Sequence, residues 1–186
     1  MNLRQLPNTL TIARILAVPP LLWLLVDERY PAAWWLALAA GVSDALDGLL
    51  AKRFHWVTRL GGLLDPIADK LLLAAGFIGL WIGGHVPTWL LALVLARDVL
   101  IVAGAGAWHG LIGPVPMTPS WLSKANTAIQ IAFVLWLMLT LAYPSLPTQG
   151  QAVAVWLVAA STVASGLHYV VLWGNRARRV RKDVSL

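Results

Sequence analysis

Two pairs of aspartates stand inside two neighbouring apolar segments of the chain. Asp44 and Asp47 are three residues apart and Asp65 and Asp69 are four apart, so in helices each pair occupies one face. A charged side chain at the centre of a bilayer costs about 2.5–3.5 kcal/mol, and four carboxylates without partners would cost on the order of 10 kcal/mol. These side chains therefore need cations, a water-filled cavity, or both.

The spacing of the two pairs predicts that they form one site. A turn at about residues 53–60 would make the two segments an antiparallel hairpin, in which Asp47 lies level with Asp65 and Asp44 with Asp69. A compact group of carboxylate oxygens suits Mg²⁺ or Mn²⁺, and the absence of cysteine from the chain and of histidine from this group argues against zinc. The alternative is a set of structural salt bridges, whose cations would be Lys52, Arg53, Arg59 and Lys70.

The elements that would hold these aspartates are transmembrane helices. The chain has 186 residues, of which 59% are hydrophobic and 12% charged, whereas a soluble domain is about a quarter charged. A bilayer crossing needs about 20 apolar residues. A short amphipathic N-terminal segment and six transmembrane helices are therefore predicted, in a single all-α integral membrane domain over residues 1–186. The predicted helices are 9–26, 32–52, 61–82, 87–108, 121–142 and 151–173.

The net charge of +6 is distributed as membrane topology would place it. Basic residues lie between the apolar segments and in the tail, 174–186, and no basic stripe with interleaved aromatics indicates nucleic acid. The alternate loops 27–31, 83–86 and 143–150 contain Arg29 as their only basic residue. Because lysine and arginine favour the cytosolic side, both termini and the aspartate pairs are predicted to face the cytosol.

The stretch from Asp44 to Asp69 resembles the signature of the CDP-alcohol phosphatidyltransferases, D-x2-D-G-x2-A-R-x8-G-x3-D-x3-D. All four aspartates, both glycines and the alanine match, while Lys52 stands in place of the family arginine with Arg53 beside it. The resemblance implies a membrane enzyme that binds CDP-diacylglycerol. An acceptor hydroxyl then attacks the phosphorus attached to the diacylglycerol and CMP is released.

The resemblance also implies a role for each matching residue. Asp44, Asp47 and Asp65 would be ligands of two Mg²⁺ or Mn²⁺ ions, and Asp69 would be the general base and also a ligand of the second ion. The opening segment, residues 7–14, also looks like that of the family, which adds nucleotide contacts near its start; the alternative there is an ordinary helix cap after a proline turn. The residues that would bind CDP-diacylglycerol are Asn8, Thr11, Gly48, Ala51, Lys52 and Thr58.

Three further residues bear on the identity of the acceptor alcohol. Arg97, Lys124 and Asn126 are the predicted acceptor-binding residues, because the Arg97-Asp98 dipeptide and the stretch 123–130 look like those of eukaryotic-type cardiolipin synthases. Phosphatidylglycerol carries a singly charged diester and needs fewer cations than glycerol 3-phosphate, so phosphatidylglycerol is the predicted acceptor. Glycerol 3-phosphate is the alternative, and for Arg97 the alternative is a structural pair with Asp98.

Two other classes of function are alternatives to the enzyme. Acids inside a membrane also mark ion-coupled transporters, but many of these show duplicated halves and this chain shows no internal repeat. A non-catalytic membrane scaffold is the second. The resemblance favours the enzyme, and it further implies a homodimer among membrane lipids, located in a bacterial inner membrane or its equivalent.

Overall fold

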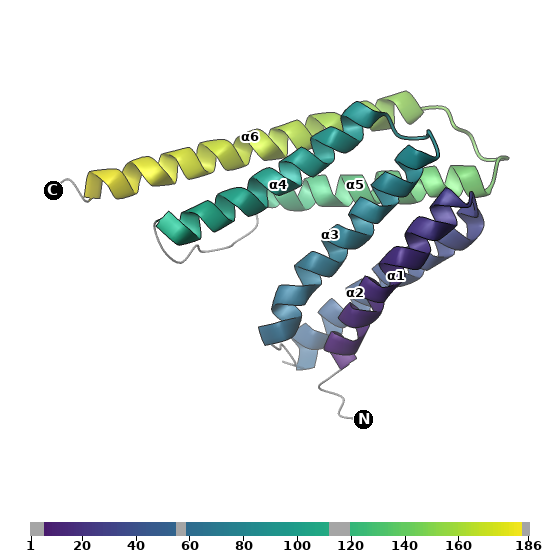
Figure 1. Cartoon of the computed structure of the whole chain (residues 1–186), viewed down its shortest axis with the longest axis horizontal. Helices are drawn as coiled ribbons and strands as arrows, with labels where there is room; N and C mark the ends of the chain where they lie inside the picture. The colour runs from purple at the N-terminus through teal and green to yellow at the C-terminus, as the bar shows by residue number, and fades with distance from the viewer. Residues whose placement is uncertain (1–5, 55–58, 112–119, 184–186) are drawn as a thin grey trace. The chain divides into compact units, whose positions relative to one another are not determined.

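A computed structural model describes residues 6–54, 59–111 and 120–183, and the side chains within 9–45, 64–106, 108 and 120–174. All regular structure in these ranges is α-helical, which confirms the predicted all-α class (Figure 1). The helices are α1 (Leu6–Val26), α2 (Tyr30–Phe54), α3 (Arg59–Ile82), α4 (Thr88–Leu111), α5 (Trp121–Ala142) and α6 (Gln151–Asp183).

Four of these helices are long and apolar enough to cross a membrane. Within the described residues the candidate spans are Thr9–Val26, Thr88–Gly106, Trp121–Ala142 and Gln151–Gly174. Among the described residues, no such span is found in α2 or α3, the helices that carry the acidic pairs.

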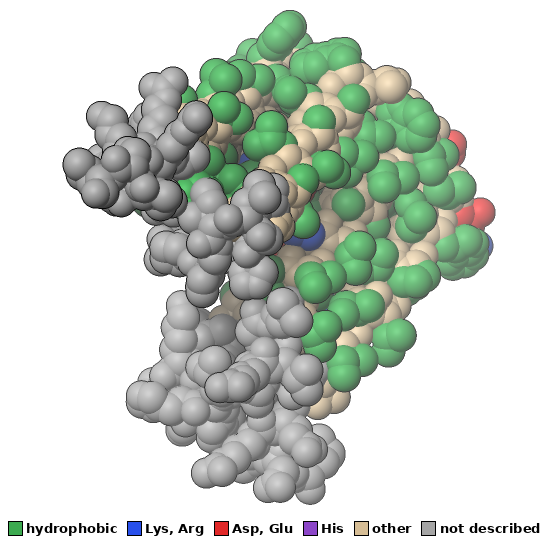
Figure 2. Space-filling view, turned by 60° about the vertical axis from the view of Figure 1, so that its left-hand side comes forward, with side chains coloured by type: hydrophobic (Ala, Val, Ile, Leu, Met, Phe, Trp, Pro, Cys, Tyr) green, Lys and Arg blue, Asp and Glu red, His purple; other side chains and the backbone are tan. Residues whose placement is uncertain are grey.

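Large apolar side chains are exposed along the helices instead of being confined to a core. Figure 2 shows hydrophobic side chains spread over much of the face in view. Surface of this kind marks contact with lipid or with another protein. The exposed residues include Trp23, Trp35, Val99, Val102, Trp156 and Val171.

The chain divides into two compact units, of which the first comprises residues 1–87 and 134–149 and the second 88–133 and 150–186. The prediction of a single domain stays a prediction. In the first unit α1 packs against both α2 and α3. The buried side chains of α1 recur at helical spacing and form one stripe, which consists of Thr11, Arg14, Leu21 and Leu25.

At the C-terminal end of this stripe, α1 and α3 approach each other closely. A Cβ atom added at Gly79 of α3 would lie 2.6 Å from the Cβ and Cδ1 atoms of Leu25, which is itself fully buried. Glycine at this position therefore sets the distance between the two helices.

We expect Gly79→Ala to lower the stability of the protein by about 1–3 kcal/mol, because the added methyl group forces the two helices apart. The measurement is thermal unfolding in detergent. Gly41→Ala on α2 is the matched control, since a Cβ there meets no atom within 4 Å and alanine favours helix. Equal unfolding temperatures for the two variants would contradict the close approach.

In the second unit α4 packs against α6, and the first part of α5 joins them. The indole ring of Trp173 on α6 packs directly over Gly104 of α4. The rings of Trp89 and Trp156 also meet between these helices, with their centroids 5.3 Å apart. The second unit is thus held by aromatic packing along α4 and α6 and, as described below, by buried hydrogen bonds to α5.

Candidate active site

Three of the four predicted metal ligands converge on a single cation, the guanidinium group of Arg14. Its Nη1 atom contacts carboxylate oxygens of both Asp44 on α2 and Asp69 on α3. Its Nη2 atom lies 3.2 Å from Oδ1 of Asp65. Asp44 and Asp69 share one nitrogen atom, so they lie level with each other, as the antiparallel arrangement predicted.

Thr11 completes this group from the same helix. Its hydroxyl donates a hydrogen bond to Oδ1 of Asp65, and the side chain is fully buried. Thr11 and Arg14 are three residues apart on α1 and therefore present their polar atoms to the same neighbours. The predicted contact of Thr11 with the nucleotide stays a prediction; in the structure Thr11 holds a carboxylate in place.

The carboxylates of this group are partly exposed, whereas the guanidinium is buried. The side chain of Arg14 is 3% exposed, whereas those of Asp44, Asp65 and Asp69 are 41%, 43% and 44% exposed. An ion or a phosphate that approached this group would therefore meet the acid side chains first.

The donor set fits a hard divalent cation. Among the described side chains, no three histidine, cysteine, aspartate or glutamate groups lie close enough together to ligate one metal ion, and here the guanidinium lies between the acids. Yet all three carboxylates reach one positive group, and carboxylate oxygens are the ligands that Mg²⁺ and Mn²⁺ prefer. The three residues therefore suit such an ion in their donor chemistry, while in this arrangement the guanidinium occupies the space between them.

Several predicted site residues lie beyond the described side chains. Thr58 lies outside the described residues altogether. The others belong to α1 or α2, but only their backbone is described; they are Asn8, Asp47, Gly48, Ala51 and Lys52.

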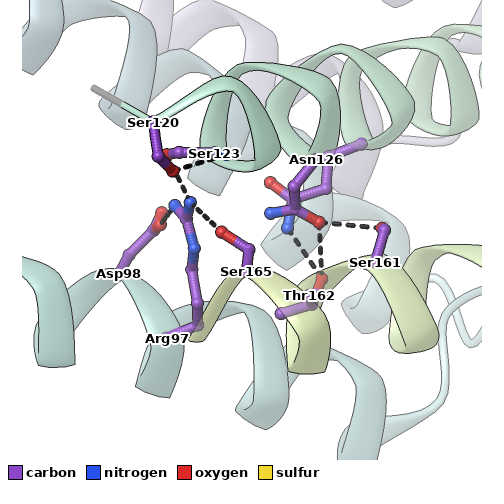
Figure 3. A network of polar contacts seen from close by, with 9 residues as sticks. Arg97, Asp98, Ser120, Ser123, Asn126, Ser161, Thr162 and Ser165 are labelled. Carbon is purple, nitrogen blue, oxygen red and sulfur yellow. Dashed lines mark hydrogen bonds and ion pairs between the residues drawn. The ribbon is translucent and has the colours of Figure 1, made fainter. Parts of the chain in front are cut away.

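A second polar cluster lies in the second unit, around Arg97 of α4. The Arg97 side chain is 4% exposed and its Nη1 atom donates to Asp98 at 2.7 Å. Its Nη2 atom donates to the hydroxyls of Ser123 on α5 at 2.6 Å and Ser165 on α6 at 2.7 Å (Figure 3). The structural pair with Asp98 is therefore formed, and the guanidinium also ties the three helices together.

A separate set of hydrogen bonds joins α5 to α6 around Asn126. Asn126 accepts from Ser161 at 2.8 Å and from Thr162 at 3.1 Å (Figure 3). Gln130 donates to Thr162 at 3.1 Å. Asn126 and Gln130 are almost completely buried, yet Nδ2 of the first and Oε1 of the second have no hydrogen-bond partner among the described residues. The cluster is thus a buried polar seam with spare hydrogen-bonding capacity.

Two of the three predicted acceptor-binding residues belong to this seam and the third does not. Arg97 on α4 and Asn126 on α5 are buried, and each forms a hydrogen bond with α6. Lys124 is exposed, because two residues along a helix place it on a different face from Asn126. Their shared role in binding the acceptor stays a prediction.

Arg14 is the residue that the sequence analysis missed. In the sequence it belongs to an apolar predicted helix and to the opening segment that resembles the family's. The available signal was its spacing from Thr11, which puts two polar side chains on one face of an otherwise apolar helix. Ser161, Thr162 and Gln130 were missed as well, because each is a small or neutral side chain whose partner lies on another helix.

Comparison with known proteins agrees with the motif. A family model described as CDP-alcohol phosphatidyltransferase matches residues 4–167, which is most of the chain. A cardiolipin synthase (CMP-forming) of Streptomyces coelicolor is 38% identical over 72% of this chain and 65% of its own length. A chloroplastic CDP-diacylglycerol–glycerol-3-phosphate 3-phosphatidyltransferase of Oryza sativa is 31% identical over 95% of this chain and 58% of its own length.

These two relatives are longer than the region they share, since the chain spans less than two thirds of either. A probable phosphatidylglycerophosphate synthase of Mycobacterium tuberculosis is 32% identical, and the match covers 91% of this chain and 81% of the relative. The match to the family model extends over both units, and it includes the acids of α2 and α3 and the seam of α4, α5 and α6. The chain therefore belongs to the CDP-alcohol phosphatidyltransferase family.

Proposed function

We propose that this protein is a membrane enzyme of phospholipid biosynthesis that transfers the phosphatidyl group of CDP-diacylglycerol to a glycerol-type alcohol, with release of CMP. The observation that carries the proposal is the convergence of Asp44, Asp65 and Asp69 from α2 and α3 on one positive group. Membership of the family supplies the substrate class.

In the proposed reaction Asp69 accepts the proton of the acceptor hydroxyl. The oxygen of that hydroxyl attacks the phosphorus attached to the diacylglycerol and forms a new phosphodiester bond. The bond from this phosphorus to the bridging oxygen of the pyrophosphate breaks, and the electron pair leaves with CMP. Asp69 suits this role because its carboxylate is 44% exposed and can be reached by a second substrate.

Asp44, Asp47, Asp65 and Asp69 would hold two Mg²⁺ or Mn²⁺ ions. Such ions neutralise the negative charge that develops on a leaving phosphate. The remaining nucleotide-side residues of the proposal are Asn8, Thr11, Gly48, Ala51, Lys52 and Thr58. Of these, Thr11 contributes an observed contact with the acid group, namely its hydrogen bond to Asp65.

Phosphatidylglycerol is the proposed acceptor, which would make the enzyme a cardiolipin synthase. The Arg97 guanidinium is already joined to Asp98, Ser123 and Ser165. Because Asp98 already balances part of the guanidinium's charge and the two serines use part of its donors, it suits a singly charged diester better than a near-dianionic phosphomonoester. Arg97, Lys124 and Asn126 are the proposed acceptor-binding residues. The similarity to the Oryza sativa enzyme keeps glycerol 3-phosphate as the second candidate.

We further propose six membrane crossings, both termini and the acid group on the cytosolic side, and a homodimer in a bacterial inner membrane or its equivalent. Five basic residues in the tail support this orientation, since lysine and arginine accumulate on the cytosolic side. They are Arg176, Arg178, Arg179, Arg181 and Lys182.

The acceptor is tested with purified protein, CDP-diacylglycerol and either phosphatidylglycerol or glycerol 3-phosphate. We expect the lipid product from phosphatidylglycerol to be cardiolipin, identified by mass spectrometry, together with one CMP for each molecule formed. A reaction without acceptor measures the background hydrolysis. A product from glycerol 3-phosphate alone would reverse the choice of acceptor, and no CMP with either alcohol would overturn the proposed function.

A further inference from the structure

Arg14 is a buried cation at a position that the proposed reaction does not use. Its side chain is 3% exposed, and it contacts three carboxylates of the proposed metal site, from two different helices. A buried guanidinium with acid partners is usually permanent, because removal of either side leaves an uncompensated charge. Here, however, the acid partners are also the residues that fit a divalent ion.

The guanidinium and a divalent ion would draw on the same atoms. Arg14 contacts the Oδ1 atoms of Asp44, Asp65 and Asp69, and its Nη1 atom joins α2 to α3 through the first and last of these. A Mg²⁺ ion needs oxygens at about 2.0–2.1 Å in near-octahedral geometry. One set of oxygens does not meet that requirement while a planar guanidinium lies between them.

The hydrogen bonds of Arg14 also leave it incompletely satisfied. Among the described residues, its Nε atom is buried and has no hydrogen-bond partner. A buried donor without a partner is costly, so this position does not satisfy every donor of the side chain. If the guanidinium turned away from the acids, the Arg14 side chain would give up a set of hydrogen bonds that is already incomplete.

We infer that Arg14 is a placeholder cation: it neutralises the acid group while no metal is bound and is displaced from the carboxylates when a divalent ion binds. This inference rests on the metal site of the proposed function and adds a competition within the chain itself. The affinity of the protein for the ion is therefore reduced by the population of the state in which Arg14 holds the acids.

The competition is tested by metal binding without substrate. Full-length protein in detergent is titrated with Mn²⁺, and free Mn²⁺ is followed by its electron paramagnetic resonance signal. We expect Arg14→Met, which keeps an apolar stem without the charge, to bind Mn²⁺ about 10-fold more tightly than the unchanged protein. The same variant unfolds at a lower temperature than the unchanged protein in EDTA, and Mn²⁺ raises its unfolding temperature by the larger amount.

Two further variants guard against loss of folding and against a general effect of charge. Arg14→Lys keeps a cation but lacks the fork that spans three carboxylates, so it binds Mn²⁺ about 3-fold more tightly. Arg29→Met removes an exposed arginine of the same unit, which pairs with Asp27 at 2.6 Å, and leaves Mn²⁺ binding unchanged.

Equal or weaker Mn²⁺ binding by both Arg14 variants would overturn the placeholder role, as would an equal gain in unfolding temperature with Mn²⁺ for Arg14→Met and the unchanged protein. An unchanged protein that binds no Mn²⁺ would overturn the metal site and the placeholder with it. If the unchanged protein binds Mn²⁺ and releases CMP while the variants bind no more tightly, the placeholder alone fails.

Discussion

Asp69→Asn is expected to lower the rate of CMP release from CDP-diacylglycerol by at least about 10²–10⁴-fold, the usual contribution of a general base. Asparagine keeps the shape of the side chain and can accept a hydrogen bond from Arg14, but it cannot take the proton of the acceptor hydroxyl. Because Asp69 is also a proposed metal ligand, the loss lies at or beyond the upper end of this range. The assay measures CMP with saturating acceptor.

The control for this variant is Asp27→Asn, in the same unit. Asp27 pairs with Arg29 at the exposed turn after α1 and belongs to no proposed site. The Asp27→Asn variant should release CMP at the rate of the unchanged protein. Both variants should elute from size exclusion as the unchanged protein does. Turnover by a folded Asp69→Asn protein within a few-fold of normal would remove Asp69 from the mechanism and favour a scaffold.

Removal of divalent metal is expected to stop the reaction completely and reversibly. Protein treated with EDTA and freed of the chelator should release no CMP, and Mg²⁺ or Mn²⁺ should restore the rate, because the pyrophosphate then has no other ion to neutralise its leaving group. The measurement is the rate of CMP release against the concentration of added ion.

Loss of activity in EDTA must be separated from unfolding, and Arg14 makes this possible. With its guanidinium among Asp44, Asp65 and Asp69, the metal-free acid group still has a cation, so the chelated protein should remain folded. EDTA saturated beforehand with Mg²⁺ serves as the control for the chelator itself. A chelated protein that keeps full turnover would exclude the proposed metal site.

The sequence predicted the helices well where apolar runs end at turn residues. The predicted segment 121–142 coincides with α5, and 87–108 lies within three residues of α4 at both ends. The prediction for the last helix ended at 173, whereas α6 continues to Asp183. The apolar pattern stops there, but arginine and lysine have high helix propensity and carry the helix onward.

The acid group was predicted only in part, because its third helix could not be read from the motif. Spacing within α2 and α3 brought Asp44 level with Asp69, which needs only helical geometry and a turn. That α1 would supply Thr11 and Arg14 depends on packing against both helices at once, which no local pattern encodes. The seam around Asn126 was hidden for the same reason, since its hydrogen bonds join α5 to α6 over more than 30 residues of sequence.

The buried stripe of α1 includes two contacts with α3 that differ in kind. Arg14 is bound electrostatically to the acids, and Leu25 is wedged against Gly79. They are eleven residues apart, about three full turns of helix, so both face α3. The number of residues between Arg14 and Leu25 is therefore fixed. One residue more or fewer would rotate one of these side chains about 100° away from its partner on α3. The position of Arg14 among the acids is thus tied to the tight packing of Leu25 on Gly79 at the other end of α1.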